Sequence, residues 1–141
     1  MANGDGMLKP TTFDHIVLNV RDVEKSLEFY SEVLGFEIDV PRLERFRKGE
    51  TGFATVRINQ DTIVDLFPKT DLARSEQDEI KNLNHFAVAF EKFEMSEFIK
   101  LLKQRGIQIV RGPMTLAGAK GKGEILNILD PDSNSIEVRQ Y

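Results

Sequence analysis

The sequence states one plan twice, with a period of about seventy residues. Each half begins with a short apolar strand that carries one histidine near its start, at residues 13–20 and 84–90. A segment with apolar side chains at helical spacing follows each strand and stops at a glycine, Gly35 or Gly106. Self-similarity at a fixed period marks repeated structural units, so the chain is predicted to contain two modules of one kind.

Three strand-like segments follow the helix in each half. They are Glu37–Pro41, Gly52–Ile58 and Thr62–Phe67 in the first half, and Gln108–Arg111, Glu124–Leu129 and Ser135–Tyr141 in the second. A single β-α-β-β-β module would leave one face of its sheet exposed, so the two modules must pair. We predict an α+β fold in which two paired βαβββ modules form a cup-shaped mixed sheet with the helices outside.

The module boundaries follow from the same pattern. We predict a disordered leader at residues 1–10, module 1 at 11–68, a charged linker at 69–82 and module 2 at 83–141. The leader lacks the apolar core of a signal peptide. A membrane span needs about 18 consecutive apolar residues, and the sequence contains no such run.

Composition excludes several kinds of function. The formal net charge of -4 argues against a nucleic-acid partner, which requires a clustered basic face. The absence of cysteine excludes a disulfide framework, a thiolate metal site and a cysteine nucleophile, and it fits the cytoplasm. Basic residues gather at 42–48 and at Lys120 and Lys122. We interpret both groups first as solvated loops and second as anion contacts.

Both histidines and two acids occupy matching places in the repeat. Strand alternation puts His15 and His85 on the face opposite the bulky apolar residues, where a cavity lining is expected. Asp65 lies 50 positions after His15, and Glu137 lies 52 after His85, each inside an apolar strand. Because a buried acid is costly unless it is paired or bound to metal, a shared metal explains all four residues.

The predicted site is therefore a divalent metal centre with His15, Asp65, His85 and Glu137 as ligands. Two imidazoles and one or two carboxylates suit Ni, Zn, Mn, Fe or Co. The alternatives are a core or surface role for each histidine, and for Asp65 a solvent-facing position or a hydrogen bond to a ligand histidine. Because Asp65 has the shortest reach, coordination by three protein ligands stays open.

Other polar residues are candidates for substrate contact. Asn19 shares the face of His15, Lys120 lies in the glycine-rich loop 118–123, and Arg139 shares the face of Glu137. The loop has no Walker pattern, so it is interpreted as a mobile lid or a hairpin connection beside the cavity. For Arg139, a surface position near the C-terminus is the alternative.

The motifs from Asp14 to Val20, from Ser26 to Phe36, from Asn84 to Val88 and from Asp130 to Val138 resemble the vicinal oxygen chelate superfamily. This superfamily includes glyoxalases, bleomycin-resistance proteins and dioxygenases, and the chain looks closest to the small glyoxalase-domain proteins. The resemblance implies paired βαβββ modules around a metal, and a homodimer. In glyoxalase I the ligands are His, Glu, His and Glu, which fall here on His15, Asp65, His85 and Glu137. Fosfomycin thiol transferases use a His, His and Glu set.

The resemblance implies a metal-dependent enzyme of lyase or isomerase type, whose small substrate is chelated through two vicinal oxygens. Glu137 or Asp65 would be its general base. The alternatives are a drug- or metabolite-binding protein without turnover, like bleomycin-resistance proteins, and a thiol transferase or dioxygenase of the same superfamily. Extradiol ring cleavage is the least favoured, because it needs a third histidine that the chain lacks.

Overall fold

A computed structural model describes Met7 and residues 11–69 and 83–141 of the chain. Module 1 contains β1 (His15–Val20), α1 (Val23–Glu28), the π-helical turn η1 (Phe29–Val33), β2 (Glu37–Ile38), α2 (Val40–Arg47), β3 (Ala54–Arg57) and β4 (Ile63–Pro68). Module 2 contains β5 (Phe86–Ala89), α3 (Met95–Gln104), β6 (Ile109–Gly118), β7 (Gly121–Leu129) and β8 (Ser135–Gln140). The predicted leader and linker lie outside the described residues, apart from Met7 and Lys69.

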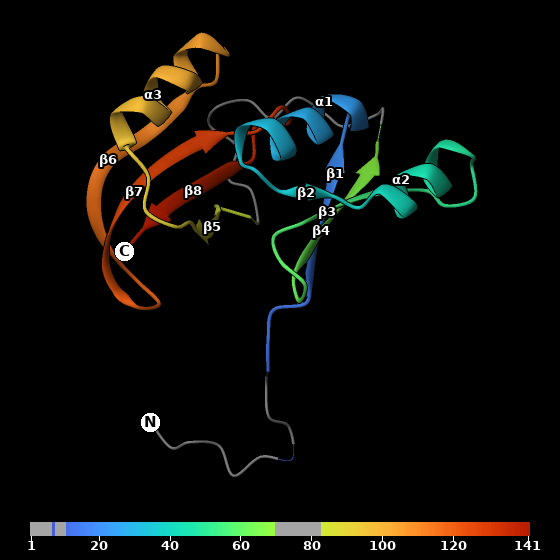
Figure 1. The fold of residues 1–141 in the computed structure, drawn as a ribbon, viewed down its shortest axis with the longest axis horizontal. Coiled ribbons are helices and arrows are strands. Elements are labelled where there is room, and N and C mark those ends of the chain that lie inside the picture. The colour runs from blue at the N-terminus through green and yellow to red at the C-terminus, as the bar shows by residue number, and fades with distance from the viewer. Residues whose placement is uncertain (1–6, 8–10, 70–82) are drawn as a thin grey trace.

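The strands form two four-stranded sheets with the same topology. Their orders are β1-β4-β3-β2 and β5-β8-β7-β6. In each sheet the first and last strands of the module are parallel, and the other neighbours are antiparallel. The two sheets are separate in Figure 1, and no other described strand pairs with the outer side of β1 or β5, so each forms an open edge within the described part of the chain. The α+β class with two mixed sheets and βαβββ-like modules is confirmed.

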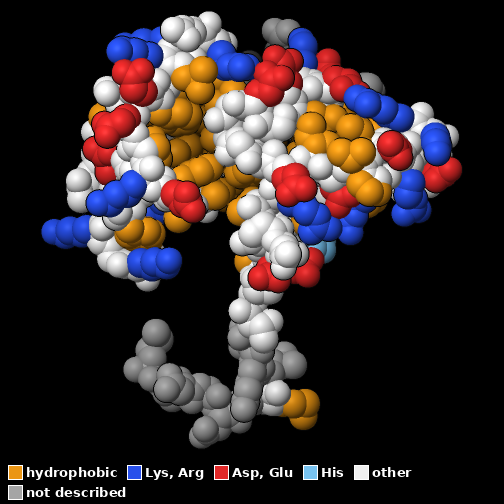
Figure 2. Space-filling view, in the orientation of Figure 1, with side chains coloured by type: hydrophobic (Ala, Val, Ile, Leu, Met, Phe, Trp, Pro, Cys, Tyr) orange, Lys and Arg blue, Asp and Glu red, His pale blue; other side chains and the backbone are white. Residues whose placement is uncertain are grey.

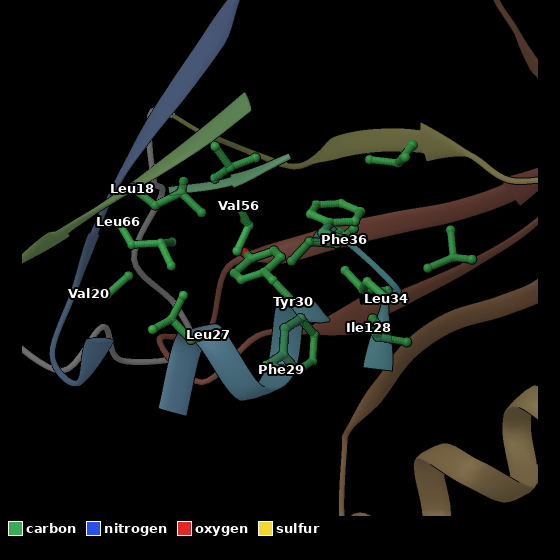
Figure 3. Close-up of a cluster of buried hydrophobic side chains, with 14 of the residues drawn as sticks. Leu18, Val20, Leu27, Phe29, Tyr30, Leu34, Phe36, Val56, Leu66 and Ile128 are labelled. Atoms are coloured by element: carbon green, nitrogen blue, oxygen red, sulfur yellow. The ribbon is translucent and has the colours of Figure 1, made fainter. Parts of the chain in front are cut away.

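The hydrophobic core joins the two modules. Leu18 and Val20 of β1 are buried and alternate with exposed His15, Val17 and Asn19, as predicted for a strand with one face on the core. Figure 3 shows the centre of this core, where side chains of α1, η1 and the segment after them meet those of both sheets. The labelled members are Leu18, Val20, Leu27, Phe29, Tyr30, Leu34, Phe36, Val56, Leu66 and Ile128. The first helix thus packs between the sheets.

A buried polar cluster also connects the modules. The Tyr30 hydroxyl donates a 2.7 Å hydrogen bond to Asp130 Oδ2, in the predicted turn before β8. Asp130 Oδ1 accepts from the backbone N–H groups of Asp132 and Asn134, which shapes the turn. Burial raises the pKa of Asp130 above its ordinary value and raises the pKa of Tyr30 well above 10.0.

The segment after β2 differs from the prediction. A strand over 37–41 and a solvated loop over 42–48 were expected, but the strand ends at Ile38 and helix α2 occupies residues 40–47. Asp39 Oδ1 caps this helix by accepting from the Arg42 N–H at 3.2 Å, and Pro41 lies in its first turn. Both are helix-start signals that competed with the β-branched residues before them.

The predicted glycine-rich loop is a tight hairpin. β6 extends to Gly118, which pairs directly with Gly121 at the start of β7. Lys120 therefore lies at the hairpin tip and is exposed. Of the two interpretations of this segment, the hairpin connection is correct. The described helices include none that is long and apolar enough to span a membrane.

Candidate metal centre

The two histidines are held in the same way. His15 Nδ1 lies 2.6 Å from Asp14 Oδ1, and His85 Nδ1 lies 2.6 Å from Asn84 Oδ1. Because these oxygens accept, each Nδ1–H is the donor, and in a neutral ring Nε2 is then the nitrogen that can bind a metal. A hydrogen bond on the far ring nitrogen is the arrangement that orients metal-binding histidines. The side chains of His15 and His85 are 47% and 35% exposed, so both rings are partly open to solvent.

In module 2 the histidine meets its acid. Glu137 in β8 pairs with Ala87 in β5, and His85 precedes that strand by one residue. His85 Nε2 lies 3.7 Å from Glu137 Oε1. The Glu137 side chain is 6% exposed, so its carboxylate is buried and points to the histidine. We call the face of each sheet that carries the acid the site face.

In module 1 the acid and the histidine share a face. Asp65 in β4 pairs with Val17, two residues after His15, so all three side chains lie on the site face of this sheet. Asp65 is buried and accepts a 2.7 Å hydrogen bond from Thr55 Oγ1. The solvent-facing alternative for Asp65 is wrong, because the residue is only 7% exposed and β4 is an inner strand. Its described partner is Thr55 and not a histidine.

The four predicted ligands form two half-sites. His85 and Glu137 belong to one sheet, and His15 and Asp65 belong to the other. Within the described part of the chain, no three His, Asp or Glu side chains come together around one point. The open edge of β5 borders a cavity of about 470 Å³, which is also lined by Ile16 of β1 and by Phe13 just before that strand. Each half-site therefore lies on or beside an open sheet edge.

Arg139 is buried beside the acid of module 2. One of its Nη atoms donates to Glu137 Oε2 at 2.9 Å, and the guanidinium also donates to the carbonyls of Leu116 and Ala117. Only 6% of its side chain is exposed, so the surface alternative is wrong. A Cβ added at Gly118 would clash with the Arg139 guanidinium, so a side chain at this position would displace the guanidinium from its present place.

The other predicted substrate contacts are in different positions. Asn19 lies on the site face of the first sheet, next to Phe67 of β4, and is exposed. Lys120 lies at the hairpin tip, where its backbone N–H donates to the Tyr141 hydroxyl and its Nζ is 6.0 Å from the centre of that ring. The structure therefore brings Arg139 to Glu137, while Asn19 and Lys120 contact neither histidine nor acid.

Arg111 was not among the predicted site residues. The predicted strand ended at Arg111, so the alternation of side chains did not indicate which face of the sheet Arg111 would occupy. In the structure a register irregularity in β6 pairs Arg111 with Asn127, which in turn pairs with Glu137. One Nη of Arg111 lies 3.5 Å from Glu137 Oε1 and 3.5 Å from Asn127 Oδ1. A bulge of this kind re-aims a side chain and leaves no period-two signal in the sequence.

A larger apolar cavity lies away from the half-sites. Figure 2 shows a hollow lined by hydrophobic side chains between α3 and α1. Its volume is about 600 Å³, and its walls include Phe36, Phe90, Phe93 and Phe98. None of the four predicted metal ligands lines it.

Comparison with known proteins places this geometry in a family. A family model described as the Glyoxalase/Bleomycin resistance protein/Dioxygenase superfamily matches residues 12–138. Virulence protein STM3117 of Salmonella typhimurium is 30% identical over 91% of this chain and 83% of its own length. The glyoxalase domain-containing protein RDO1 of Mycosarcoma maydis is 28% identical over 95% of this chain and 70% of its own length.

More distant similarities agree with this placement. Lactoylglutathione lyase GLX1 of Arabidopsis thaliana is 27% identical over 91% of this chain, which spans 44% of that enzyme. The crystal structure of a glyoxalase/dioxygenase from Nostoc punctiforme shares the fold, with a TM-score of 0.75 over 98% of both chains at 24% identity. The chain therefore belongs to the Glyoxalase/Bleomycin resistance protein/Dioxygenase superfamily.

Proposed function

We propose that this chain is a divalent-metal-dependent enzyme of glyoxalase type, a lyase or isomerase that binds a small substrate through two neighbouring oxygens. The observation that carries the proposal is that the two histidines make the same hydrogen bond through Nδ1. In each, Nδ1–H donates a hydrogen bond to a side-chain oxygen of the preceding residue, and the histidine lies on the acid-bearing face of its sheet or contacts the acid itself. The similarity to a lactoylglutathione lyase supports the reaction type.

The donor set fits such an ion. His15, Asp65, His85 and Glu137 would hold it, since imidazole nitrogen and carboxylate oxygen suit Ni, Zn, Mn, Fe and Co. When bound, the ion supplies a Lewis acid for the substrate oxygens. The chain itself supplies the orientation of each ring and a general base, for which Glu137 and Asp65 are the candidates. Burial of both carboxylates keeps water away from the oxygens that would accept a proton.

We further propose that two copies of the chain complete the site. The two half-sites lie on separate sheets, and β1 and β5 have open edges that another strand can cover. A twofold dimer that sets the first sheet of one copy beside the second sheet of its partner would create two complete sites. His15 and Asp65 would then come from one copy, and His85 and Glu137 from the other.

Metal content and mass test the proposal together. Protein purified without added metal and then exposed to Ni²⁺ or Zn²⁺ is expected to bind one ion per chain and to sediment as a dimer. Elemental analysis and analytical ultracentrifugation measure both. His85→Ala is expected to lose the ion, whereas Lys103→Ala, on the exposed face of α3, serves as the control. A wild-type protein that binds no ion stoichiometrically would contradict the metal proposal. A ligand whose affinity is unchanged by His85→Ala would favour sequestration without turnover.

A mixing experiment tests the shared site. His15→Ala and His85→Ala chains are each expected to bind no metal as homodimers. When they are unfolded, mixed and refolded, half of the dimers are mixed, and each mixed dimer has one intact site. Recovery of about a quarter of the wild-type metal is therefore expected for a shared site. No recovery is expected if each site forms within one chain, and that result would contradict the dimer proposal.

A further inference from the structure

Two arginines contact the same carboxylate in different ways. Arg139 approaches Glu137 Oε2 and Arg111 approaches Glu137 Oε1. Both lie on the site face of the second sheet, Arg139 on the strand of the acid and Arg111 on the far edge strand β6. A carboxylate with one cation on each oxygen is well compensated already. Compensation of the Glu137 charge by Arg139 therefore does not by itself explain why Arg111 also lies beside this carboxylate.

Arg139 is committed to its present partners. Its guanidinium donates to Glu137 and to two backbone carbonyls, and its Cζ lies 4.8 Å from the centre of the Tyr141 ring. The absence of a side chain at Gly118 provides the space in which it rests. At 6% exposure it reaches no open volume, so its role is to position Glu137.

Arg111 is loosely held. Its side chain is 45% exposed, and its contacts with Glu137 and Asn127 are both 3.5 Å long. Hydrogen bonds to carboxylates that contribute strongly are about 2.7–2.9 Å long. A guanidinium has five N–H donors, and a single Nη makes both of these long contacts. Arg111 therefore has N–H donors beyond these two contacts, on a side chain that is half exposed beside Glu137.

Whether Arg111 is free to bind another anion depends on the negative charge of Glu137. In the described part of the chain, Glu137 is the only acid with which Arg111 forms an ion pair. If Oε1 binds a divalent cation, its negative charge is compensated by that ion. Arg111 then loses its anionic partner while staying half exposed next to the substrate position. Two acids balance a divalent ion, and the two arginines remain as the excess positive charge of the site.

We propose that Arg111 is a substrate-binding residue and that the substrate is an oxyanion. It would carry a carboxylate or phosphoryl group that supplies one of the two metal-binding oxygens and turns another of its oxygens to Arg111. This inference rests on the proposed metal site and names the substrate class of that site. A guanidinium recognises such groups through paired N–H donors, which a lysine cannot reproduce fully.

Binding of a matched pair of probes tests the proposal. Lactate and lactamide both offer a hydroxyl and a carbonyl oxygen on neighbouring carbons, but only lactate carries a charge. Their affinities for nickel-loaded wild-type protein, Arg111→Met, Arg111→Lys and Arg45→Met are compared by calorimetry. Arg45 is the control, because it is an exposed arginine that pairs with Glu50 in module 1.

The expected result is a selective loss. Arg111→Met is expected to weaken lactate binding about 10- to 100-fold, with lactamide binding nearly unchanged. Arg111→Lys should recover part of the loss, and Arg45→Met should bind both probes as the wild type does. Equal weakening of both probes, or lactate binding by Arg111→Met at the wild-type level, would overturn the assignment of Arg111.

A second arm needs no metal. Glu137→Gln removes the negative charge beside Arg111 but keeps an oxygen that accepts from Arg139. The metal-free Glu137→Gln protein is expected to bind inorganic phosphate more tightly than the metal-free wild type, and Glu137→Gln/Arg111→Met is expected to lose that gain. If the wild-type protein binds no nickel but this arm succeeds, the metal proposal fails and the anion site stands. If this arm shows no gain, the anion site fails even in a nickel-binding protein.

Discussion

The two modules place a histidine and an acid at equivalent positions and then surround the acid differently. In module 1, Asp65 is held by the neutral hydroxyl of Thr55. In module 2, Glu137 is held by the buried cation of Arg139 and approached by Arg111 and His85. The repeat thus sets where the histidine and the acid lie, while neighbouring residues set the charge around them. Among the described residues, charged side chains surround the acid in module 2 alone, whereas the acid in module 1 has a neutral partner.

Removing Arg139 takes away the buried cation that distinguishes module 2 from module 1, and it has the largest expected effect on the free energy of unfolding. Both partners of the Arg139–Glu137 pair are 6% exposed, so Arg139→Met leaves a buried carboxylate without its close cation. We expect a loss of about 3–5 kcal/mol in the free energy of unfolding, measured by urea denaturation. Glu137→Gln/Arg139→Met should be much less destabilised than the sum of the single variants. Additive losses would show that the two side chains are not coupled.

The equivalent change in module 1 should cost less. Thr55→Val removes the one side chain that is seen to donate to Asp65 among the described residues. Because the lost partner is neutral, we expect a loss of about 2–3 kcal/mol in the free energy of unfolding. Asp65→Asn in the Thr55→Val background should recover part of it, since no charge is then buried. A loss as large as that of Arg139→Met would contradict the proposed contrast between the modules.

The contact between the modules offers a smaller and pH-dependent test. Tyr30→Phe removes one donor to Asp130, which keeps the N–H groups of Asp132 and Asn134, so a loss of about 1–2 kcal/mol is expected at neutral pH. The pKa of Tyr30 is raised in the folded protein by burial, so folding holds this proton more tightly. Wild-type stability should therefore fall as the pH rises above the ordinary tyrosine pKa.

The variant provides the control for that titration. Because Tyr30→Phe has no proton to lose at this position, its stability should fall less steeply in alkaline solution than that of the wild type. Denaturant unfolding at pH 9, 10 and 11 measures both slopes. Tyr141, which is 37% exposed, remains in both proteins and does not distinguish them. Identical slopes would show that the Tyr30 proton is not linked to folding.

The parts of this fold that follow from local periodicity were predicted correctly. Alternation in β1 placed His15, Val17 and Asn19 opposite the core, and the structure leaves these three side chains exposed. The same alternation predicted that Asp65 and Glu137 lie on the cavity face of their strands. The strand register places them beside Val17 and Ala87, on the same sheet face as the histidine of each module. These features depend on residues close in sequence, which is why a pattern reveals them. That the four residues hold a metal remains a prediction.

Features that depend on distant packing were not predicted. The burial of Arg139 requires space at Gly118, on another strand, and the position of Arg111 requires an irregularity in β6. Neither leaves a periodic signal. The sequence also did not predict that the half-sites are separate. No local pattern indicates whether two modules pair within a chain or between chains. Helix α2 had a local signal in Asp39 and Pro41 that the strand pattern obscured.

The helices that follow the first strand of each module give the smallest and cleanest comparison. Asp22 caps α1 by accepting from the Lys25 N–H at 3.1 Å, whereas Glu94 at the start of α3 makes no capping hydrogen bond. Asp22→Ala should therefore lower the free energy of unfolding by about 1 kcal/mol. Glu94→Asp should raise it by about 0.5–1 kcal/mol, because the shorter side chain can reach the free N–H groups of the first turn. Thermal unfolding of the two variants measures both shifts. A loss on Glu94→Asp would mean that the longer side chain already stabilises the start of α3 in another way, and the two modules would then differ less at this point than their caps suggest.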